Sequence, residues 1–70
     1  MSDKEYMPLF YDGVVRESDD AYFLDFGDHQ QWIPKSLIDP DYLPLEEAGG
    51  EINVELWFVE QEGLEDYENV

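Results

Sequence analysis

The clearest pattern of hydrophobic and polar positions lies in residues 21–34. Within 21–26, the apolar residues that share one face are Tyr22, Leu24 and Phe26. This alternation predicts a β-strand with one buried face. The Gly-Asp-His segment at 27–29 predicts a tight turn, and residues 30–33 form a partner strand that Pro34 ends. A further strand at Val14–Val15, before a polar turn at 17–20, completes an antiparallel meander.

The second half of the chain begins with an irregular acidic segment. Residues 35–50 contain Pro40 and Pro44 among several carboxylates, and we expect Tyr42, Leu43 and Leu45 to pin this loop to the body of the protein. A short strand follows at 51–54.

Residues 55–62 fit a helix of two turns. Gly63 stands where a left-handed residue ends such a helix, and Leu64 stands where a hydrophobic contact accompanies that ending.

These elements predict one α+β domain over residues 1–70. The domain has a small, barrel-like antiparallel sheet of three to four strands and one short C-terminal helix, with frayed ends at 1–7 and 65–70. We expect the core to consist of the large apolar residues of the strands and the helix: Val14, Phe23, Leu24, Phe26, Trp32, Ile33, Trp57 and Phe58.

Charge changes this picture of an ordinary small domain. The chain has 19 Asp and Glu against 3 Lys and Arg, a formal net charge of −16. Because B-DNA carries one charge per roughly 1.7 Å of its axis, 19 carboxylates equal the phosphate charge of about 32 Å of duplex. Self-repulsion of this size destabilises a compact state, so we expect a functional reason for it.

Composition narrows the class of protein further. Aromatic residues make up 16% of the chain, which favours a packed core over a disordered acidic tail. The absence of cysteine excludes disulfides and thiolate metal sites. We see no secretory signal and no transmembrane run. The charge is expected to repel nucleic acid and membranes and to attract a basic surface.

The acidic residues form the predicted partner-binding site. Carboxylates held on a rigid sheet can pair with the Arg and Lys side chains that normally hold the DNA backbone. The candidates in the meander, the central loop and the start of the predicted helix are Asp19, Asp20, Asp25, Asp28, Asp39, Asp41, Glu46, Glu47, Glu51 and Glu55. Any one of them alone is most simply a solvated charge. The excess of 16 acids over bases favours the functional interpretation for the set as a whole.

Other chemistries receive less support. Carboxylate pairs such as Asp39 with Asp41 suit Ca²⁺ or Mg²⁺, but the EF-hand spacing is absent, so we predict no metal site and no cofactor. His29 is the single histidine and lies in a predicted turn, without a nucleophile motif. We therefore predict a binding protein that is not an enzyme.

The segment Trp32-Ile33-Pro34-Lys35-Ser36 matches the "WIPKS" signature of short phage and prophage proteins. Residues 21–36 follow the order of elements in that family, and residues 55–64 are similar to its C-terminal helix, without the family's proline. The resemblance covers about half the chain and implies a phage origin and a small β-sheet or barrel fold with a terminal helix. The known members are much less acidic. In size and charge the chain also resembles anti-CRISPR and anti-restriction proteins that mimic DNA.

We therefore expect a phage-encoded inhibitor that acts in the host bacterial cytoplasm. It would occupy the DNA-binding surface of a defence protein, such as a CRISPR–Cas effector subunit, without binding nucleic acid or membranes itself. The alternative is an acidic phage or halophile domain with a structural or interaction role and no DNA-related target, since acidic surfaces also suit high salt.

Overall fold

The computed structural model describes residues 5–68, and these form five strands, one α-helix and three 3₁₀ helices. The strands are β1 (Tyr6–Tyr11), β2 (Gly13–Glu17), β3 (Ala21–Asp25), β4 (Gln30–Pro34) and β5 (Gly50–Glu55). The 3₁₀ helices η1 (Lys35–Leu37) and η2 (Pro40–Tyr42) lie between β4 and β5. Helix α1 (Leu56–Glu62) follows β5 directly, and η3 (Leu64–Tyr67) comes next. The predicted α+β class is confirmed.

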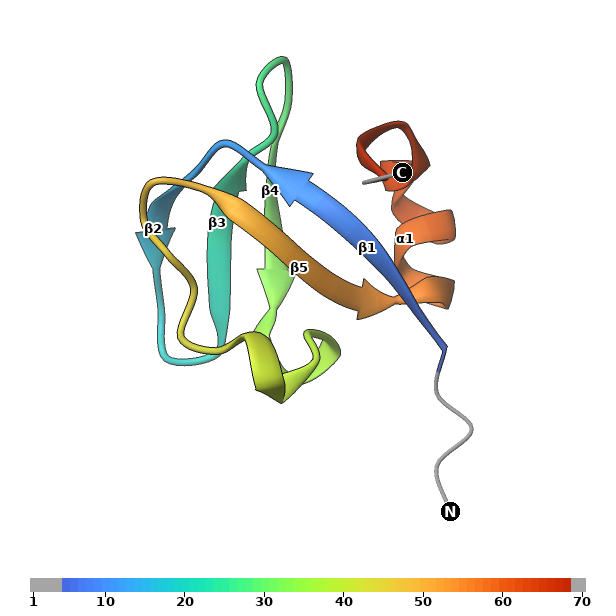
Figure 1. Cartoon of the computed structure of the whole chain (residues 1–70), viewed down its shortest axis with the longest axis horizontal. Helices are drawn as coiled ribbons and strands as arrows, with labels where there is room; N and C mark the ends of the chain where they lie inside the picture. Colours follow the sequence, from blue (N-terminus) through green and yellow to red (C-terminus); the bar gives the residue numbers. More distant parts are fainter. Residues whose placement is uncertain (1–4, 69–70) are drawn as a thin grey trace.

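The strands form two antiparallel sheets. One is the predicted meander in the order β2-β3-β4, and the other pairs β1 with β5. Figure 1 shows the β1–β5 pair crossing the three-stranded sheet, with α1 beside both. An isolated bridge between Ile38 and Val54 connects the segment after β4 to β5. The two sheets are thus joined by backbone pairing as well as by side-chain packing.

The expected faces of the meander are confirmed. Tyr22, Leu24 and Phe26 are buried, and Ile33 lies on the same inner side of β4. On β2 the register shifts between Val14 and Arg16, so Val15 is the additional residue of a β-bulge. The bulge directs Arg16 to the outer face, opposite Phe23 of β3.

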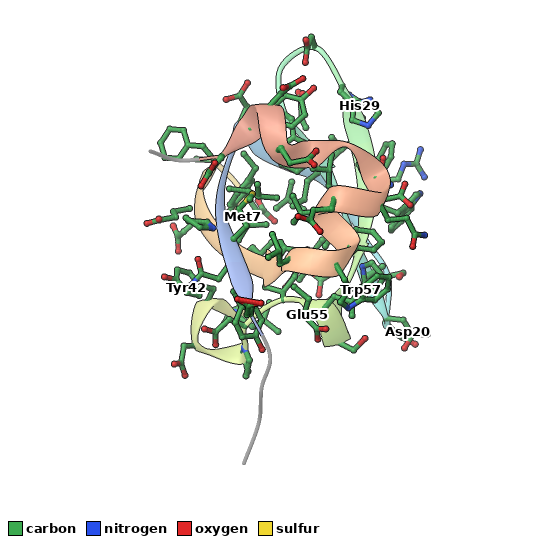
Figure 2. The ribbon with its side chains drawn as sticks, turned by 90° about the vertical axis from the view of Figure 1, so that its right-hand side faces the viewer. Met7, Asp20, His29, Tyr42, Glu55 and Trp57 are labelled. Carbon is green, nitrogen blue, oxygen red and sulfur yellow. The ribbon has the colours of Figure 1, made fainter. Side chains whose placement is uncertain are left out.

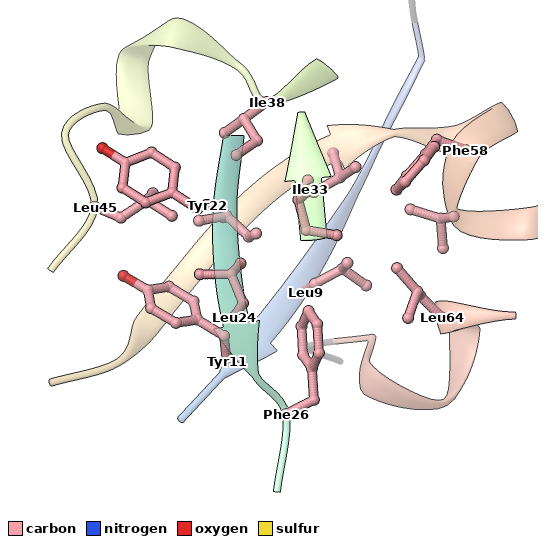
Figure 3. Close-up of a cluster of buried hydrophobic side chains, with 13 residues drawn as sticks. Leu9, Tyr11, Tyr22, Leu24, Phe26, Ile33, Ile38, Leu45, Phe58 and Leu64 are labelled. Carbon is pink, nitrogen blue, oxygen red and sulfur yellow. The ribbon is translucent and has the colours of Figure 1, made fainter. Parts of the chain in front are cut away.

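The core lies between the two sheets and is closed at one side by α1 and η3. Figure 3 shows Tyr11, Tyr22 and Leu45 at one side of this cluster and Phe58 and Leu64 at the other. Each fully buried Leu, Ile or Val side chain contributes about 1.5–3 kcal/mol relative to its exposed state. As predicted, Leu45 is buried in the core and holds the central loop against it.

Strand β1 is a difference from the sequence-based expectation. Tyr6 and Met7 belong to this strand and pair with Glu55 and Val54, so they are not frayed. Pro8 obscured the strand, because proline removes a ladder donor. Here the sheet pairs β1 with β5 alone, and a single bridge at Leu9 is the further backbone pairing of β1 among residues 5–68, so most of its second edge is open and proline is tolerated. The described residues therefore contain five strands, one more than the upper end of the predicted three to four.

The C-terminal prediction of fraying is also corrected over part of its range. Residues 65–67 belong to η3, and Glu68 forms a bridge with Leu9 of β1. Leu64 is buried and fixes this segment to the core, which is the physical reason for its order. The expectations for residues 1–4 and 69–70 lie outside the described residues.

Two members of the expected core are exposed. Trp32 has 43% of its surface accessible and Trp57 has 53%. Trp32 lies on the outer face of β4, between the inward positions Gln31 and Ile33. Phe23 shares that outer face and is only partly buried. The size and hydrophobicity of Phe23 and Trp32 suggested core positions, whereas the alternation of the strands places both rings on the outer face.

Candidate functional site

The carboxylates cover the molecule instead of forming one patch. Within residues 5–68 all are exposed except Asp25 and Asp39, which are partly exposed, and Glu55, which is buried. An accessible surface of 4515 Å² divided among 19 acidic residues gives about 240 Å² for each. The longest dimension of the molecule, 33 Å, is close to the length of duplex that carries the same charge, about 32 Å.

The ten predicted binding residues lie at separate places in the fold. Asp19 and Asp20 precede β3, whereas Asp25 and Asp28 are at its other end. Figure 2 shows Asp20 and His29 at opposite ends of the molecule. The remaining candidates lie in the loop before β5 and on β5 itself: Asp39, Asp41, Glu46, Glu47, Glu51 and Glu55. The structure therefore brings them together as pairs and not as a single cluster.

The turn before β3 has a backbone fixed by Ser18. Its hydroxyl oxygen accepts hydrogen bonds from the backbone N–H groups of Asp20 and Ala21, at 3.3 and 3.0 Å. The backbone N–H of Ser18 donates to the carbonyl oxygen of Ala21 at 2.8 Å. Asp19 and Asp20 are both exposed on this turn. Their carboxylates are thus presented to solvent by an ordered segment.

Lys35 forms an ion pair with Glu17, the residue just before this turn. Its Nζ donates to Glu17 Oε2 at 2.7 Å and lies 5.0 Å from the centroid of the Tyr22 ring. The hydrogen bond to Glu17 raises the pKa of Lys35 above its ordinary value. Lys35 therefore stays charged and compensates Glu17, while Asp19 and Asp20 remain outside this pair.

The turn after β3 holds a second pair of acidic residues. Asp25 Oδ1 accepts a hydrogen bond from the backbone N–H of Gly27 at 2.7 Å. The backbone carbonyl of Asp25 accepts from the N–H of Asp12, also at 2.7 Å. Asp25 therefore has a structural role in shaping the turn, in addition to the charge that it carries.

Asp28 is fixed by a residue far away in the sequence. The Tyr67 hydroxyl donates to Asp28 Oδ1 at 2.6 Å, and this bond raises the pKa of Tyr67 to about 12. The Tyr67 ring stacks on Phe26, with 4.8 Å between ring centroids, and its centroid is 6.4 Å from that of His29. The β3–β4 turn is thereby tied to η3.

The central loop is anchored through its backbone. The Tyr11 hydroxyl donates to the carbonyl of Glu46 at 2.7 Å, and Val14 N–H donates to the carbonyl of Glu47 at 3.1 Å. Burial raises the pKa of Tyr11, so this hydroxyl keeps its proton. The Glu46 and Glu47 side chains themselves are exposed. This arrangement combines a fixed main chain with outward carboxylates.

Asp39 and Asp41 are related by a cap. Asp39 Oδ1 accepts from the backbone N–H of Asp41 at 3.0 Å, at the start of η2. This bond satisfies a backbone donor that a helix start otherwise leaves unpaired. Asp39 is therefore a capping residue, and Asp41 is the more exposed member of the pair.

Glu55 differs from the other nine candidates because only 8% of its surface is accessible. Its Oε1 accepts from Trp57 Nε1 at 2.8 Å, and Figure 2 shows these two residues together. They line a pocket of about 270 Å³ with Glu5, Leu56 and Glu60. Glu55 thus supports the position of Trp57 and offers little surface of its own to a protein partner.

The structure reveals exposed aromatic residues that the sequence analysis placed in the core. The Phe23 and Trp32 rings have centroids 5.0 Å apart on the outer face of the meander. The five tyrosines, in contrast, are all partly or fully buried. The period-two alternation of β3 already indicated that Phe23 faces outward, because its neighbours Tyr22 and Leu24 face inward.

The described residues offer little for metal binding or for crossing a membrane. Across residues 5–68, no three Asp, Glu or His side chains gather in a way that could hold a metal ion. His29 is exposed and its Nε2 lies 2.9 Å from Gln31 Oε1. In the same part of the chain, no helix is long and apolar enough to cross a membrane.

Comparison with known proteins gives no relative from which a role could be transferred. No family model, no curated protein and no solved structure matches this chain.

Proposed function

We propose that this protein is a phage-encoded inhibitor that binds the DNA-binding surface of a bacterial defence protein. Its carboxylates take the places of DNA phosphates, so the target, such as a CRISPR–Cas effector subunit, cannot load DNA. The proposed site of action is the host bacterial cytoplasm. The observation that carries the proposal is an array of exposed carboxylates on an ordered backbone.

Order in the backbone matters for affinity. A binding partner does not have to fix the turn at 18–21 or the loop at 46–47, because the Ser18 and Tyr11 hydrogen bonds already do so. Because these segments are ordered before association, less conformational entropy is lost on binding, and more of the ion-pair energy contributes to affinity. Charge of this density also steers a basic partner into rapid association, and this effect weakens with salt.

The test is competition for DNA. A labelled target duplex is bound to each member of a panel of purified CRISPR–Cas effector complexes, and binding is followed by fluorescence anisotropy. We expect prior addition of this protein to prevent duplex binding by at least one complex, and the inhibition to weaken as salt rises from 50 to 200 mM. Inhibition of no complex, or inhibition indifferent to salt, contradicts the proposal.

Two variants of equal net charge sharpen this test. One replaces four exposed predicted carboxylates by their amides: Asp19, Asp20, Glu46 and Glu47. The control replaces four exposed carboxylates of α1, η3 and the residue after it: Glu60, Glu65, Asp66 and Glu68. We expect at least tenfold weaker inhibition from the first, equivalent to about 1.4 kcal/mol, and a smaller loss from the control. An equal loss from both contradicts the assignment of residues.

A further inference from the structure

A row of three residues crosses the outer face of the meander. Arg16 of β2 lies opposite Phe23 of β3, which lies opposite Trp32 of β4. Side chains at directly opposed positions on one face of a sheet are close neighbours. We call this row, with the bulge residue Val15, the aromatic face. Its members come from three strands, so the sheet holds them in a fixed arrangement.

The aromatic face is not covered by other described parts of the chain. The core, β1 and β5 lie against the opposite side of the sheet, where Tyr22, Leu24 and Ile33 point. Trp32 remains 43% exposed and Val15 46% exposed. Arg, Phe and Trp are enriched in protein interfaces, and Trp and Arg are the commonest residues with large effects on binding.

Acidic residues stand at both ends of this face. Asp19 and Asp20 lie at one end of β3, beside the Glu17–Lys35 ion pair, and Asp25 and Asp28 lie at the other. Five residues of strand separate these ends by about 17 Å. Aromatic residues and Arg are enriched in protein interfaces, so two rings beside Arg16 with polar surroundings fit such an interface. Four aspartates at the ends against this one arginine leave the face negative as a whole, which fits a positive partner.

We propose that the aromatic face is the surface with which this protein docks on an arginine-rich protein surface. The inference rests on the proposed function and names the face that serves it. Guanidinium groups of the partner pair with the carboxylates at both ends, and one stacks on the Trp32–Phe23 rings. Binding therefore has a salt-sensitive part from the ends and a less sensitive part from the rings.

Charge decides against two other occupants of the face. A single-stranded nucleic acid stacks bases on exposed aromatic rings, but it also requires a positive groove. A second copy of the chain brings another net charge of −16. Both would place like charges against the acidic ends, which costs binding energy. A basic protein surface is the occupant that the charges favour.

The experiment uses the ¹⁵N-labelled full chain and a nine-residue polyarginine peptide, with nine-residue polylysine for comparison. NMR resolves the indole N–H groups of Trp32 and Trp57 as separate reporters. We expect polyarginine to shift the signals of Trp32, Phe23 and their neighbours on β2–β4 at the lowest peptide concentrations, with Trp57 responding less. Polyarginine should bind about two- to fivefold more tightly than polylysine, because Arg stacks better on the rings.

Matched variants follow the same titration. Trp32→Ala is expected to weaken polyarginine binding about two- to fivefold, whereas Trp57→Ala, which removes an even more exposed ring from α1, leaves it unchanged. The wild-type shift map is independent of whether the variant folds. Shifts centred on Trp57 and the Glu5–Glu60 pocket, or spread evenly over all carboxylates, overturn the proposal. So does equal binding by Trp32→Ala.

The two proposals fail separately. If DNA competition succeeds but the peptide maps elsewhere, the inhibitor proposal stands and the aromatic face is wrong. If the peptide maps to the aromatic face but no effector complex loses its DNA, the docking surface stands and the DNA-binding target is wrong.

Discussion

At the scale of single residues, the hydrogen bond from Tyr67 to Asp28 couples the acidic β3–β4 turn to the C-terminal segment. The bond requires a protonated hydroxyl, so it raises the pKa of Tyr67 from 10.0 to about 12. Folding thus favours the neutral phenol. This contribution to stability is complete below pH 10, the ordinary pKa, and is lost as pH rises through 12.

We expect Asp28→Asn to return the pKa of Tyr67 toward 10, because the amide removes the charge that holds the proton. The measurement is an NMR pH titration of ¹³C-labelled tyrosine rings, which separates Tyr67 from the other four. The wild-type protein provides the control, since the two chains differ at residue 28 alone. A Tyr67 that titrates at the same pH in both proteins contradicts the expectation.

At the scale of elements, α1 depends on the way in which it ends. Gly63 has φ 71° and ψ 32°, in the left-handed region, and its N–H bonds back to the carbonyls of Glu60 and Val59. A Cβ at this position would meet no atom within 4 Å. The cost of a side chain here is therefore a backbone cost alone, without a steric clash.

Gly63→Ala is expected to lower the free energy of unfolding by about 1–2 kcal/mol, the usual penalty of a left-handed L-residue. Gly63→Asn should cost less, because Asn tolerates this conformation better. Urea denaturation measures both. Equal losses for Ala and Asn would mean that the conformation of this residue is not what limits stability.

At the scale of the whole molecule, repulsion among the carboxylates should make stability depend on salt. The Debye length is about 30 Å at 10 mM and about 8 Å at 150 mM ionic strength. At 10 mM it nearly reaches the longest dimension of the protein, 33 Å, so charges at opposite ends still repel. At 150 mM only neighbouring charges do.

We expect the protein to be folded in 10 mM NaCl and to melt at a higher temperature in 150 mM NaCl, as followed by circular dichroism. KCl at equal ionic strength should have the same effect, since screening does not depend on the cation. A chain that is unfolded in 10 mM salt and folds only at high salt would instead favour the halophile alternative over the inhibitor.

The local elements could be predicted from the sequence because their signals are local. Alternation over 21–26 and Pro34 at the end of the next strand gave β3 and β4, and Gly63 followed by Leu64 gave the end of α1. Strand β1 could not be found in this way. Its partner β5 begins about forty residues later, and Pro8 is tolerated because β1 belongs to a two-stranded sheet and has one largely open edge.

The candidate site shows the same division. Charge and composition determined that most carboxylates are exposed, because ionised groups remain in water unless they are paired. Tertiary structure decided that Glu55 is buried and that Asp28 is tied to Tyr67, 39 residues away. Burial and contacts of this kind depend on packing between segments far apart in the chain, which the residue type at a single position does not encode. The outward position of Trp32, by contrast, follows from the local strand alternation. The sequence by itself determined the α+β elements and the negative charge, whereas only the packing of two sheets decided which rings and carboxylates a partner can reach.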